Sequence, residues 1–417
     1  MSPTILILLS GLGVLLVGMG LLGTLLGVRA TLASFSNIET GLIMAGYYAG
    51  YVVGTLLAPR LIRNVGHIRC FSAFAALGAA SSLAFGLMVD PWVWLVLRII
   101  SGLCVVGLYM VVESWLNEQI AGPSRGRVFS FYMMSTLVAL GAGQFLLLFG
   151  DTSELTLFAL AAILISLGVV PVALARVHEP RIEKGESPHF WQLMQAAPLG
   201  TVGALFAGLV NGSFWGMTPV FGQRLALGLD QIAILMSATI LGGALLQWPI
   251  GHLSDRYDRR NILIIVSFAT AIVAAVSAFI VLRSMPGLMP SAFVYGGLMF
   301  SLYGISVAHT YDHIEPGQAL EATRGLILIY GLGAFSGPLL AGVAMDSIGP
   351  VGLPVVAATT AALLALFGLY RVTRRASPPL DEQTEFVPMV RTSPMAMEMH
   401  PDVDMEPELD LQQPKES

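Results

Sequence analysis

Charged side chains gather in one short segment of this 417-residue chain, in which only 11% of all residues are charged. The segment is "GHLSDRYDRR", residues 251–260, and its ionisable side chains are Asp255, Arg256, Asp258, Arg259 and Arg260. Acids and arginines so close together form charge-assisted hydrogen bonds with one another and with nearby helix ends. The chemistry that this segment offers is therefore ion pairing.

Arg98 is a second candidate, because it is a charged residue inside the apolar run "WLVLRIISG". An arginine keeps its charge at any useful pH, and it costs roughly 2.5–3.5 kcal/mol in the middle of a membrane helix. Two interpretations are open. Either the guanidinium faces a central cavity, where it binds an anion or takes part in proton coupling, or it snorkels to the outer lipid headgroups.

Other polar or aromatic side chains also lie inside apolar runs, where such groups either line a pathway or hold helices together. His309 titrates between pH 5 and 8 when unperturbed, so it is a candidate for coupling, although a lone histidine is often a packing residue. Tyr47 and Tyr51 share one helix face at a spacing of four residues. The further candidates for substrate binding or coupling are Gln144, Asn211, Trp215 and Gln247.

The composition predicts the elements that must position these side chains. Hydrophobic residues make up 55% of the chain and its mean hydropathy is +0.77, which is more apolar surface than one water-soluble core can bury. The chain is therefore expected to be an integral membrane protein. Its two cysteines, Cys70 and Cys104, lie in apolar runs and lack the paired spacing of a disulfide framework or a metal site.

A helix needs about 20 apolar residues to cross a hydrocarbon core of roughly 30 Å. The first such run lacks a basic n-region and is too long for a cleaved signal peptide, so we expect it to be retained. The pattern predicts an all-α protein with twelve transmembrane helices. They are centred on residues 4–27, 39–59, 69–88, 92–116, 127–149, 155–176, 198–221, 231–250, 262–282, 289–309, 325–345 and 350–370.

Basic residues predict the orientation, because cytoplasmic loops carry an excess of lysine and arginine. With a cytoplasmic N-terminus, the outer loops hold only Arg29, Arg224 and Arg283. Both termini are then cytoplasmic. The inner loops hold Arg60, Arg63, Arg69, Arg125, Arg127, Arg176, Arg181, Lys184, Arg256, Arg259, Arg260, Arg324, Arg371, Arg374 and Arg375.

The sequence also contains an internal repeat. A shift of 199 residues aligns Ser124-Arg125-Gly126 with Thr323-Arg324-Gly325 and Glu113 with Asp312. The repeat predicts two pseudo-symmetric six-helix bundles, residues 1–176 and 198–375, joined by a charged cytoplasmic linker, residues 177–197. Residues 376–417 have no helical periodicity, and their ten acidic and two basic residues give a net charge of −8. We expect a disordered acidic cytoplasmic tail.

Several motifs resemble those of the major facilitator superfamily of transporters. "GHLSDRYDRR" resembles the family's loop signature, in which Asp-Arg is followed two residues later by paired basic residues, and "RIISG", residues 98–102, resembles its Arg-x-x-x-Gly motif. "VESWLNEQ" and "VGHIRCF" are similar to one mainly bacterial branch of transporters. The first-half copy of the loop departs from the signature, since Arg63 occupies the place of the usual acid. The resemblance covers residues 1–375.

The resemblance implies that these loops form a cytoplasmic gate that pairs in one conformation only. Alternatively, the same arginines only set the orientation of the helices in the membrane and bind anionic lipid headgroups. The expected gate partners of Asp255, Arg256, Arg259 and Arg260 are Asp312 and Arg324 in the second half. In the first half they are Glu113, Arg63, Arg69 and Arg125.

Two functions fit these observations. The first is a secondary active transporter that moves a small solute by alternating access with proton coupling. Symport or facilitated diffusion is favoured because "LVALGAGQFLL" lacks the Gly-Pro motif of many antiporters in the family. The second is a membrane sensor or assembly protein on the same scaffold, with the acidic tail as its output. The solute is expected to carry an anionic or strongly polar group, or to be an amphipathic molecule held by tryptophans and tyrosines.

The remaining expectations concern catalysis, cofactors, binding partners and location. No catalytic motif such as H-E-x-x-H or G-x-S-x-G is present, so we expect neither an enzyme nor a cofactor. The basic residues lie next to the membrane, which argues against nucleic-acid binding. We expect a monomeric, multi-pass protein of the plasma membrane, the inner membrane in bacteria. Its partners are a small-molecule substrate, protons and lipids.

Overall fold

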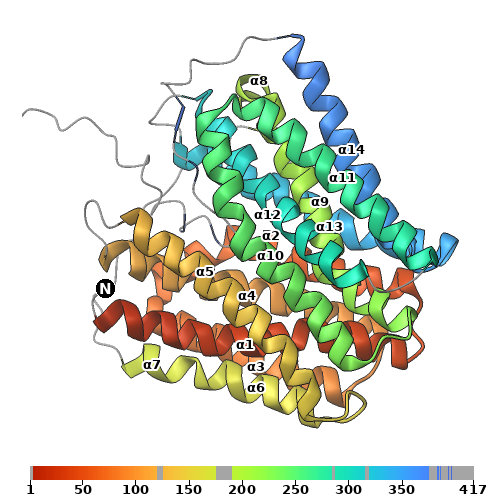
Figure 1. The fold of residues 1–417 in the computed structure, drawn as a ribbon. Helices are drawn as coiled ribbons and strands as arrows, with labels where there is room; N and C mark the ends of the chain where they lie inside the picture. The colour runs from red at the N-terminus through yellow and green to blue at the C-terminus, as the bar shows by residue number, and fades with distance from the viewer. Residues whose placement is uncertain are drawn as a thin grey trace, which may run out of the picture.

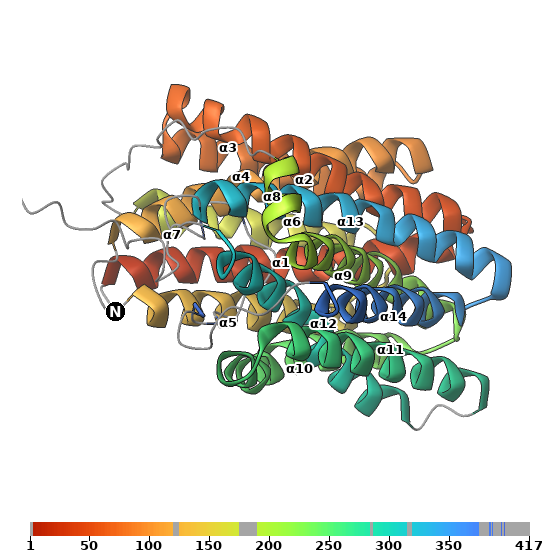
Figure 2. The ribbon, with the colours of Figure 1, turned by 90° about the horizontal axis from the view of Figure 1, so that it is seen from above.

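The computed structural model describes residues 3–119, 125–174, 190–283, 287–314 and 319–374, together with residues 383, 384, 386, 393 and 396. Every regular element in these ranges is a helix, and the long helices lie side by side (Figures 1 and 2). The prediction of an all-α membrane protein is confirmed.

The described part of the first half contains seven α-helices and one short 3₁₀-helix. Helix α2 begins with a capping box, in which Ser36 and Glu39 each accept a hydrogen bond from the other's backbone N–H. A break at Gly168 separates α6 from α7, and Pro171 follows in α7, where it lacks an N–H to donate. The elements are α1 (Pro3–Leu32), α2 (Asn37–Val65), α3 (His67–Leu87), α4 (Pro91–Gln119), α5 (Arg125–Gln144), η2 (Phe145–Phe149), α6 (Thr156–Leu167) and α7 (Val169–Leu174).

The second half repeats this arrangement after a short helix. Residues Phe190–Ala196, which belong to the predicted linker, form α8. Linker residues 177–189 lie outside the described residues. The following helices are α9 (Pro198–Arg224), α10 (Leu229–Arg256), α11 (Arg259–Arg283), α12 (Leu288–Tyr311), α13 (Ala319–Ile348) and α14 (Gly352–Val372).

Eleven segments in the described ranges are long and apolar enough to span a membrane. The predicted seventh span forms the 27-residue helix α9, which is not among the eleven. Its sequence contains six glycines, two threonines and one asparagine, but most of its residues are buried against α12, α13, α14 and α1. Neighbouring helices rather than lipid surround these polar groups, so the helix tolerates a lower hydropathy.

The helix pairs of the two halves correspond. In the first half α1 packs on α5, α2 on α4, and α3 on α6, and in the second half α9 packs on α13, α10 on α12, and α11 on α14. The contacts between halves are also paired, since α2 packs on α13 and α5 on α10. This arrangement agrees with the two related halves that the internal repeat predicts.

Glycines bring paired helices into backbone contact, as Gly333 and Gly337 on α13 show. A Cβ atom on Gly333 would lie 1.9 Å from the carbonyl oxygen of Leu205, and one on Gly337 would lie 2.3 Å from that of Leu209. The facing helix α9 has the same spacing of small residues at Gly208 and Gly212. The pair α9 and α13 therefore packs through two small-x-x-x-small patterns.

The two halves touch each other at one end of the bundle, which we call the Asn37 end. The Asn37 side-chain amide donates a 2.6 Å hydrogen bond to Asp346 on α13, and Arg224 on α9 donates to the Asn37 side-chain oxygen at 3.2 Å. The opposite end, where Asp255 and Arg259 lie, is called the Asp255 end. Figure 1 shows the helices of the two halves diverging toward the side on which the N-terminus lies.

Part of the acidic tail contacts the helices. Residues 376–417 were predicted to be disordered, yet Thr384, Phe386 and Ser393 form hydrogen bonds with the helices, and Ser393 and Ala396 are fully buried. These contacts depend on carboxylates brought together by the fold, so composition and periodicity contain no sign of them. The other tail residues, apart from Gln383, lie outside the described residues.

Candidate functional site

A cavity of about 620 Å³ lies between the two halves. Both halves contribute to its wall: α1, α2, α4 and α5 from the first, and α9 and α10 from the second. A site with this position changes shape whenever the halves move relative to each other. Its lining residues are Leu16, Met19, Gly20, Leu22, Gly23, Thr24, Tyr47, Tyr48, Arg98, Val105, Tyr109, Leu140, Trp215, Gly216 and Met236.

Arg98 is the charged residue of this wall. Its side chain is 8% exposed, its guanidinium lies 4.8 Å from the ring centroid of Tyr47, and one terminal nitrogen is 3.4 Å from the sulfur of Met44. This position, facing a cavity between helices, differs from the snorkelling alternative. The tyrosine face supplies negative potential to the cation, so a cation–π contact offsets part of its desolvation.

The other candidate residues divide into two groups. Trp215 and Tyr47 line the cavity with Arg98, whereas Tyr51 is buried beside Tyr47 and does not. Gln144 joins α5 to α1, since its amide donates to the carbonyl of Gly20 at 3.2 Å and its oxygen accepts from Thr24. Gln144 thus follows the helix-joining alternative.

Three more candidates lie away from the cavity. Asn211 is buried and donates to the carbonyl of Ala207 within its own helix at 3.1 Å. Gln247 is buried in α10. His309 is buried near the end of α12, with its ring 4.4 Å from that of His313. None of the three lines the cavity.

Sequence reasoning missed several lining residues. Tyr48, Tyr109 and Met236 belong to the wall, together with Thr24. Tyr48 was visible as part of the aromatic run on α2, but an i, i+4 argument selects Tyr47 and Tyr51 instead. Tyr109 lies eleven residues after Arg98, which is three helical turns, so the two residues share one face of α4. This shared face could have predicted that Tyr109 lines the cavity.

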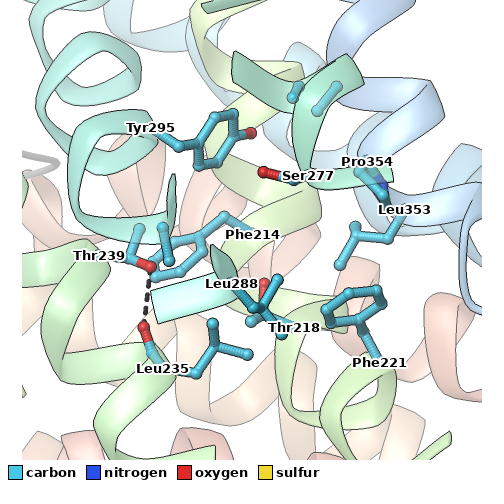
Figure 3. A pocket seen from close by; sticks show the side chains of 13 residues that line it. Phe214, Thr218, Phe221, Leu235, Thr239, Ser277, Leu288, Tyr295, Leu353 and Pro354 are labelled. Carbon is cyan, nitrogen blue, oxygen red and sulfur yellow. Dashed lines mark hydrogen bonds between the residues drawn. The ribbon is translucent and has the colours of Figure 1, made fainter. Parts of the chain in front are cut away.

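A second cavity, of about 510 Å³, lies entirely within the second half (Figure 3). Its wall is almost wholly apolar, and the hydroxyls of Thr239 and Ser277 donate to carbonyls of their own helices. It has no residue from the first half, so relative movement of the halves does not open it to both sides of the membrane. The cavity that contains Arg98 is the better candidate for a transported solute.

The charged segment forms a buried ion-pair cluster. Arg259, with 1% of its side chain exposed, binds both carboxylate oxygens of Asp312 at 2.7 and 2.9 Å and one of Asp255 at 2.9 Å. The cluster joins the ends of α10, α11 and α12. Arg260 pairs with Asp258 at 2.8 Å beside it. These contacts all lie within the second half.

The other expected gate residues are not brought into this cluster. Arg256 is exposed, and Arg324 is partly buried on α13 without an ion pair to a described residue. Arg63 and Arg69 are exposed, and the side chain of Arg125 lies outside the described residues. Glu113 instead accepts hydrogen bonds from Tyr132 and Ser393. The expected pairing of Glu113 with Arg63 and Arg69 is therefore wrong in this conformation.

No group of three His, Cys, Asp or Glu side chains within the described ranges could hold a metal ion. Cys70 and Cys104 are both buried, and they form no disulfide bond with each other.

Comparisons with known proteins agree with this architecture. A family model described as Major Facilitator Superfamily matches residues 5–319 and 200–399. The Escherichia coli K12 protein "Uncharacterized MFS-type transporter YcaD" is 28% identical over 348 residues, which is 83% of this chain and 90% of that protein.

Two solved structures share the fold. The crystal structure of the nucleoside transporter NupG matches with a TM-score of 0.72 at 14% identity, over 90% of this chain and 100% of that one. A bacterial homologue of the human lysosomal transporter Spinster, in an inward-facing and unoccupied conformation, matches with a TM-score of 0.70 at 15% identity, over 91% and 100%.

Proposed function

The chain belongs to the major facilitator superfamily of transporters, and from this premise we propose that it is a secondary transporter whose solute binds in the cavity at Arg98. Alternating access is the proposed mechanism: the halves close on one side of the solute while they open on the other. The observation that carries the proposal is the cavity between the halves, whose wall includes a nearly buried guanidinium. Family membership favours this function over a sensor or assembly protein.

The proposed solute is an organic anion with an aromatic or apolar part. Arg98 supplies the positive charge, and its planar guanidinium suits a carboxylate or phosphate. Tyr47, Tyr48 and Trp215 supply flat surfaces around it. A purely hydrophobic solute would make no use of the positive charge, and a cation would be repelled by it.

A thermal-shift screen tests this proposal. Purified protein is heated with carboxylates, sugars, amino acids and amphipathic drugs, and a carboxylate should raise the unfolding temperature of the wild type. Arg98→Ala should abolish that rise, and Arg98→Lys should weaken it because the bidentate contact is lost. Arg63→Ala removes an exposed arginine elsewhere and should keep the rise. A carboxylate that stabilises Arg98→Ala as well as the wild type would place the solute elsewhere.

Proton coupling is proposed to involve Glu113. This acid is fully buried in α4, where its carboxylate accepts from the hydroxyls of Tyr132 and Ser393. Burial with no cationic partner among the described residues favours a group that takes up and releases a proton. The bound solute and the proton would then be carried together.

Glu113→Gln should remove the coupling while it keeps the size of the side chain and one acceptor oxygen. In liposomes that contain a pH-sensitive dye, the ligand found by the screen should acidify the interior with the wild type but not with Glu113→Gln. Glu118→Gln changes an exposed acid on the same helix and should behave as wild type. Equal acidification by Glu113→Gln and the wild type would eliminate Glu113 as the coupling residue.

The Asp255 end is proposed to face the cytoplasm. The fifteen basic residues that the sequence assigns to inner loops support this orientation, against three in outer loops. The bacterial relatives support an inner-membrane location. A reporter enzyme fused after Ser417 checks the orientation, because it is active in only one compartment.

A further inference from the structure

Thr384 of the tail is bound to the ion-pair cluster of the second half. Its backbone N–H and its hydroxyl both donate to the same carboxylate oxygen of Asp312, each at 3.0 Å. Arg259 donates in turn to the Thr384 hydroxyl at 3.1 Å and to its carbonyl oxygen. The N–H, the carbonyl oxygen and the hydroxyl of Thr384 are thus all bonded to two buried charged side chains, Asp312 and Arg259.

Phe386 extends this contact along α10. Its backbone N–H donates to Asp255 at 2.8 Å. Its ring lies directly against Gly251, because a Cβ atom on that glycine would be 2.0 Å from the ring. The glycine, one turn before Asp255, therefore provides the flat surface on which an aromatic side chain rests.

Ser393 makes the corresponding contact in the first half. Its backbone N–H donates to Glu113 at 3.2 Å, and its hydroxyl donates to the same carboxylate oxygen. Ser393 and Ala396 are both 0% exposed. The tail is therefore bound to both halves at once.

Glu113 and Asp312 are equivalent positions of the internal repeat, separated by 199 residues. Glu113 lies near the end of α4 and Asp312 directly after α12, and these two helices have matching places in the halves. Each acid accepts an N–H and a hydroxyl from a single Thr or Ser of the tail. The same chemistry at two pseudo-symmetric carboxylates, with matching donors nine positions apart, argues against accidental contacts.

Chain length and charge also fit this occupant. Thr384 follows Arg374, next to the end of α14, by ten positions, over which a chain can span at most about 35 Å. The tail has a net charge of −8, while the Asp255 end is rimmed by exposed arginines such as Arg60, Arg63 and Arg256. The opposite charges attract the tail to this end.

We propose that the surface between the halves at the Asp255 end is a binding site for a peptide segment, and that its occupant is the tail of this chain, held there through Thr384, Phe386 and Ser393. At Asp312 and at Glu113 the site binds a Thr or Ser, whose backbone N–H and hydroxyl both donate to the carboxylate. At Gly251 it binds an aromatic residue, whose ring packs against the glycine. The bound tail keeps the two halves apart at the Asp255 end, which we call their inner ends, while they remain in contact at the Asn37 end. It must leave before these inner ends can close.

This consequence rests on the proposed transport cycle, whereas the binding itself does not. If transport by alternating access is correct, the tail regulates it by holding one state. Glu113 would then have two roles, since Ser393 covers the acid that is proposed to exchange a proton. Release of the tail would free both the carboxylate and the movement of the halves.

Hydrogen exchange in the full-length protein in lipid nanodiscs tests the binding. The amides of Thr384, Phe386 and Ser393 should exchange at least ten times more slowly than in a synthetic peptide of residues 376–417. Thr384→Asp/Ser393→Asp sets a like charge against each gate carboxylate and should restore the peptide rate. Ser377→Asp/Ser417→Asp adds the same charge to the tail and should keep the protection. Equal rates in wild type and peptide would overturn the proposal, even if a variant did not fold.

Distance measurements between spin labels test the consequence without a solute. Leu61 on α2 and Leu253 on α10 are exposed at the Asp255 end, one in each half, while the native cysteines are buried. With labels at Leu61→Cys and Leu253→Cys, the chain with its native tail should give one separated population. Adding Thr384→Asp/Ser393→Asp should produce a second, shorter distance. An unchanged distribution, together with lost exchange protection, would show that the tail binds without controlling the halves, and would overturn the regulatory part alone.

Discussion

Asp312→Ala should lower the stability of the protein by about 3–5 kcal/mol, the usual cost of removing one partner from a buried ion pair. Asp312 and Arg259 have only 2% and 1% of their side chains exposed, so water cannot replace the lost carboxylate. Asp255, 31% exposed, remains as a partial partner for Arg259. The thermal unfolding midpoint of purified protein, measured by intrinsic fluorescence, should fall clearly.

Asp258→Ala is the matched control for this prediction. It breaks an ion pair in the same loop, but the Asp258 side chain is 23% exposed and its partner Arg260 is 10% exposed. Its cost should stay near 1 kcal/mol or below. Asp312→Asn should lie between the two, because it keeps a hydrogen-bond acceptor while losing the charge. If the Asp312 and Asp258 variants melt together, the cluster does not hold α10, α11 and α12 together as described.

Gly333→Ala should disrupt the packing of α13 on α9. The added Cβ would lie 1.9 Å from the carbonyl oxygen of Leu205 and 2.9 Å from the backbone nitrogen of Leu209. Both are backbone atoms, so no side chain can turn away and the helices must separate. Overpacking of this kind costs about 1–3 kcal/mol or more, and the variant should give a lower unfolding midpoint and less folded protein in detergent.

Gly13→Ala provides the comparison in a helix with free space. Nothing lies within 4 Å of a Cβ at Gly13, so the substitution adds no clash. Alanine is the better helix former by about 0.5–1 kcal/mol, and this variant should be neutral or slightly more stable. A Gly333→Ala variant as stable as Gly13→Ala would mean that α9 and α13 are not in backbone contact.

The sequence predicted most of the fold because its strongest signals are local. Runs of apolar residues set the number and approximate position of the helices, and Ser36 with Glu39 marked the start of α2. Gly333 and Gly337 predicted a close helix contact, but their spacing did not reveal that the partner is α9. The break at Gly168 was missed because it interrupts an apolar run only briefly. The short helix α8 was missed because its seven residues are too few to give a clear pattern before the apolar run of α9.

The site was predicted in part. A lone arginine inside an apolar run is costly, which made Arg98 stand out, and the structure places it on the cavity with Tyr47 and Trp215. Gln144, Asn211 and His309 have the same kind of sequence signal and lie elsewhere. A polar residue lies on one face of its helix. Only the neighbouring helices determine whether that face meets a cavity, a carbonyl group or another side chain.

The sequence by itself determined the class of protein, its helices, its internal repeat and its family resemblance, because hydropathy, charge and motifs act over short stretches of chain. Tertiary structure alone decided the contacts between residues far apart: Arg259 with Asp312, Asn37 with Asp346, and Ser393 with Glu113. Such contacts form because separate helices bring their ends to the same depth and leave buried charges that require partners. Thr384 and Ser393 show that residues from a segment with no periodicity of its own can meet such carboxylates.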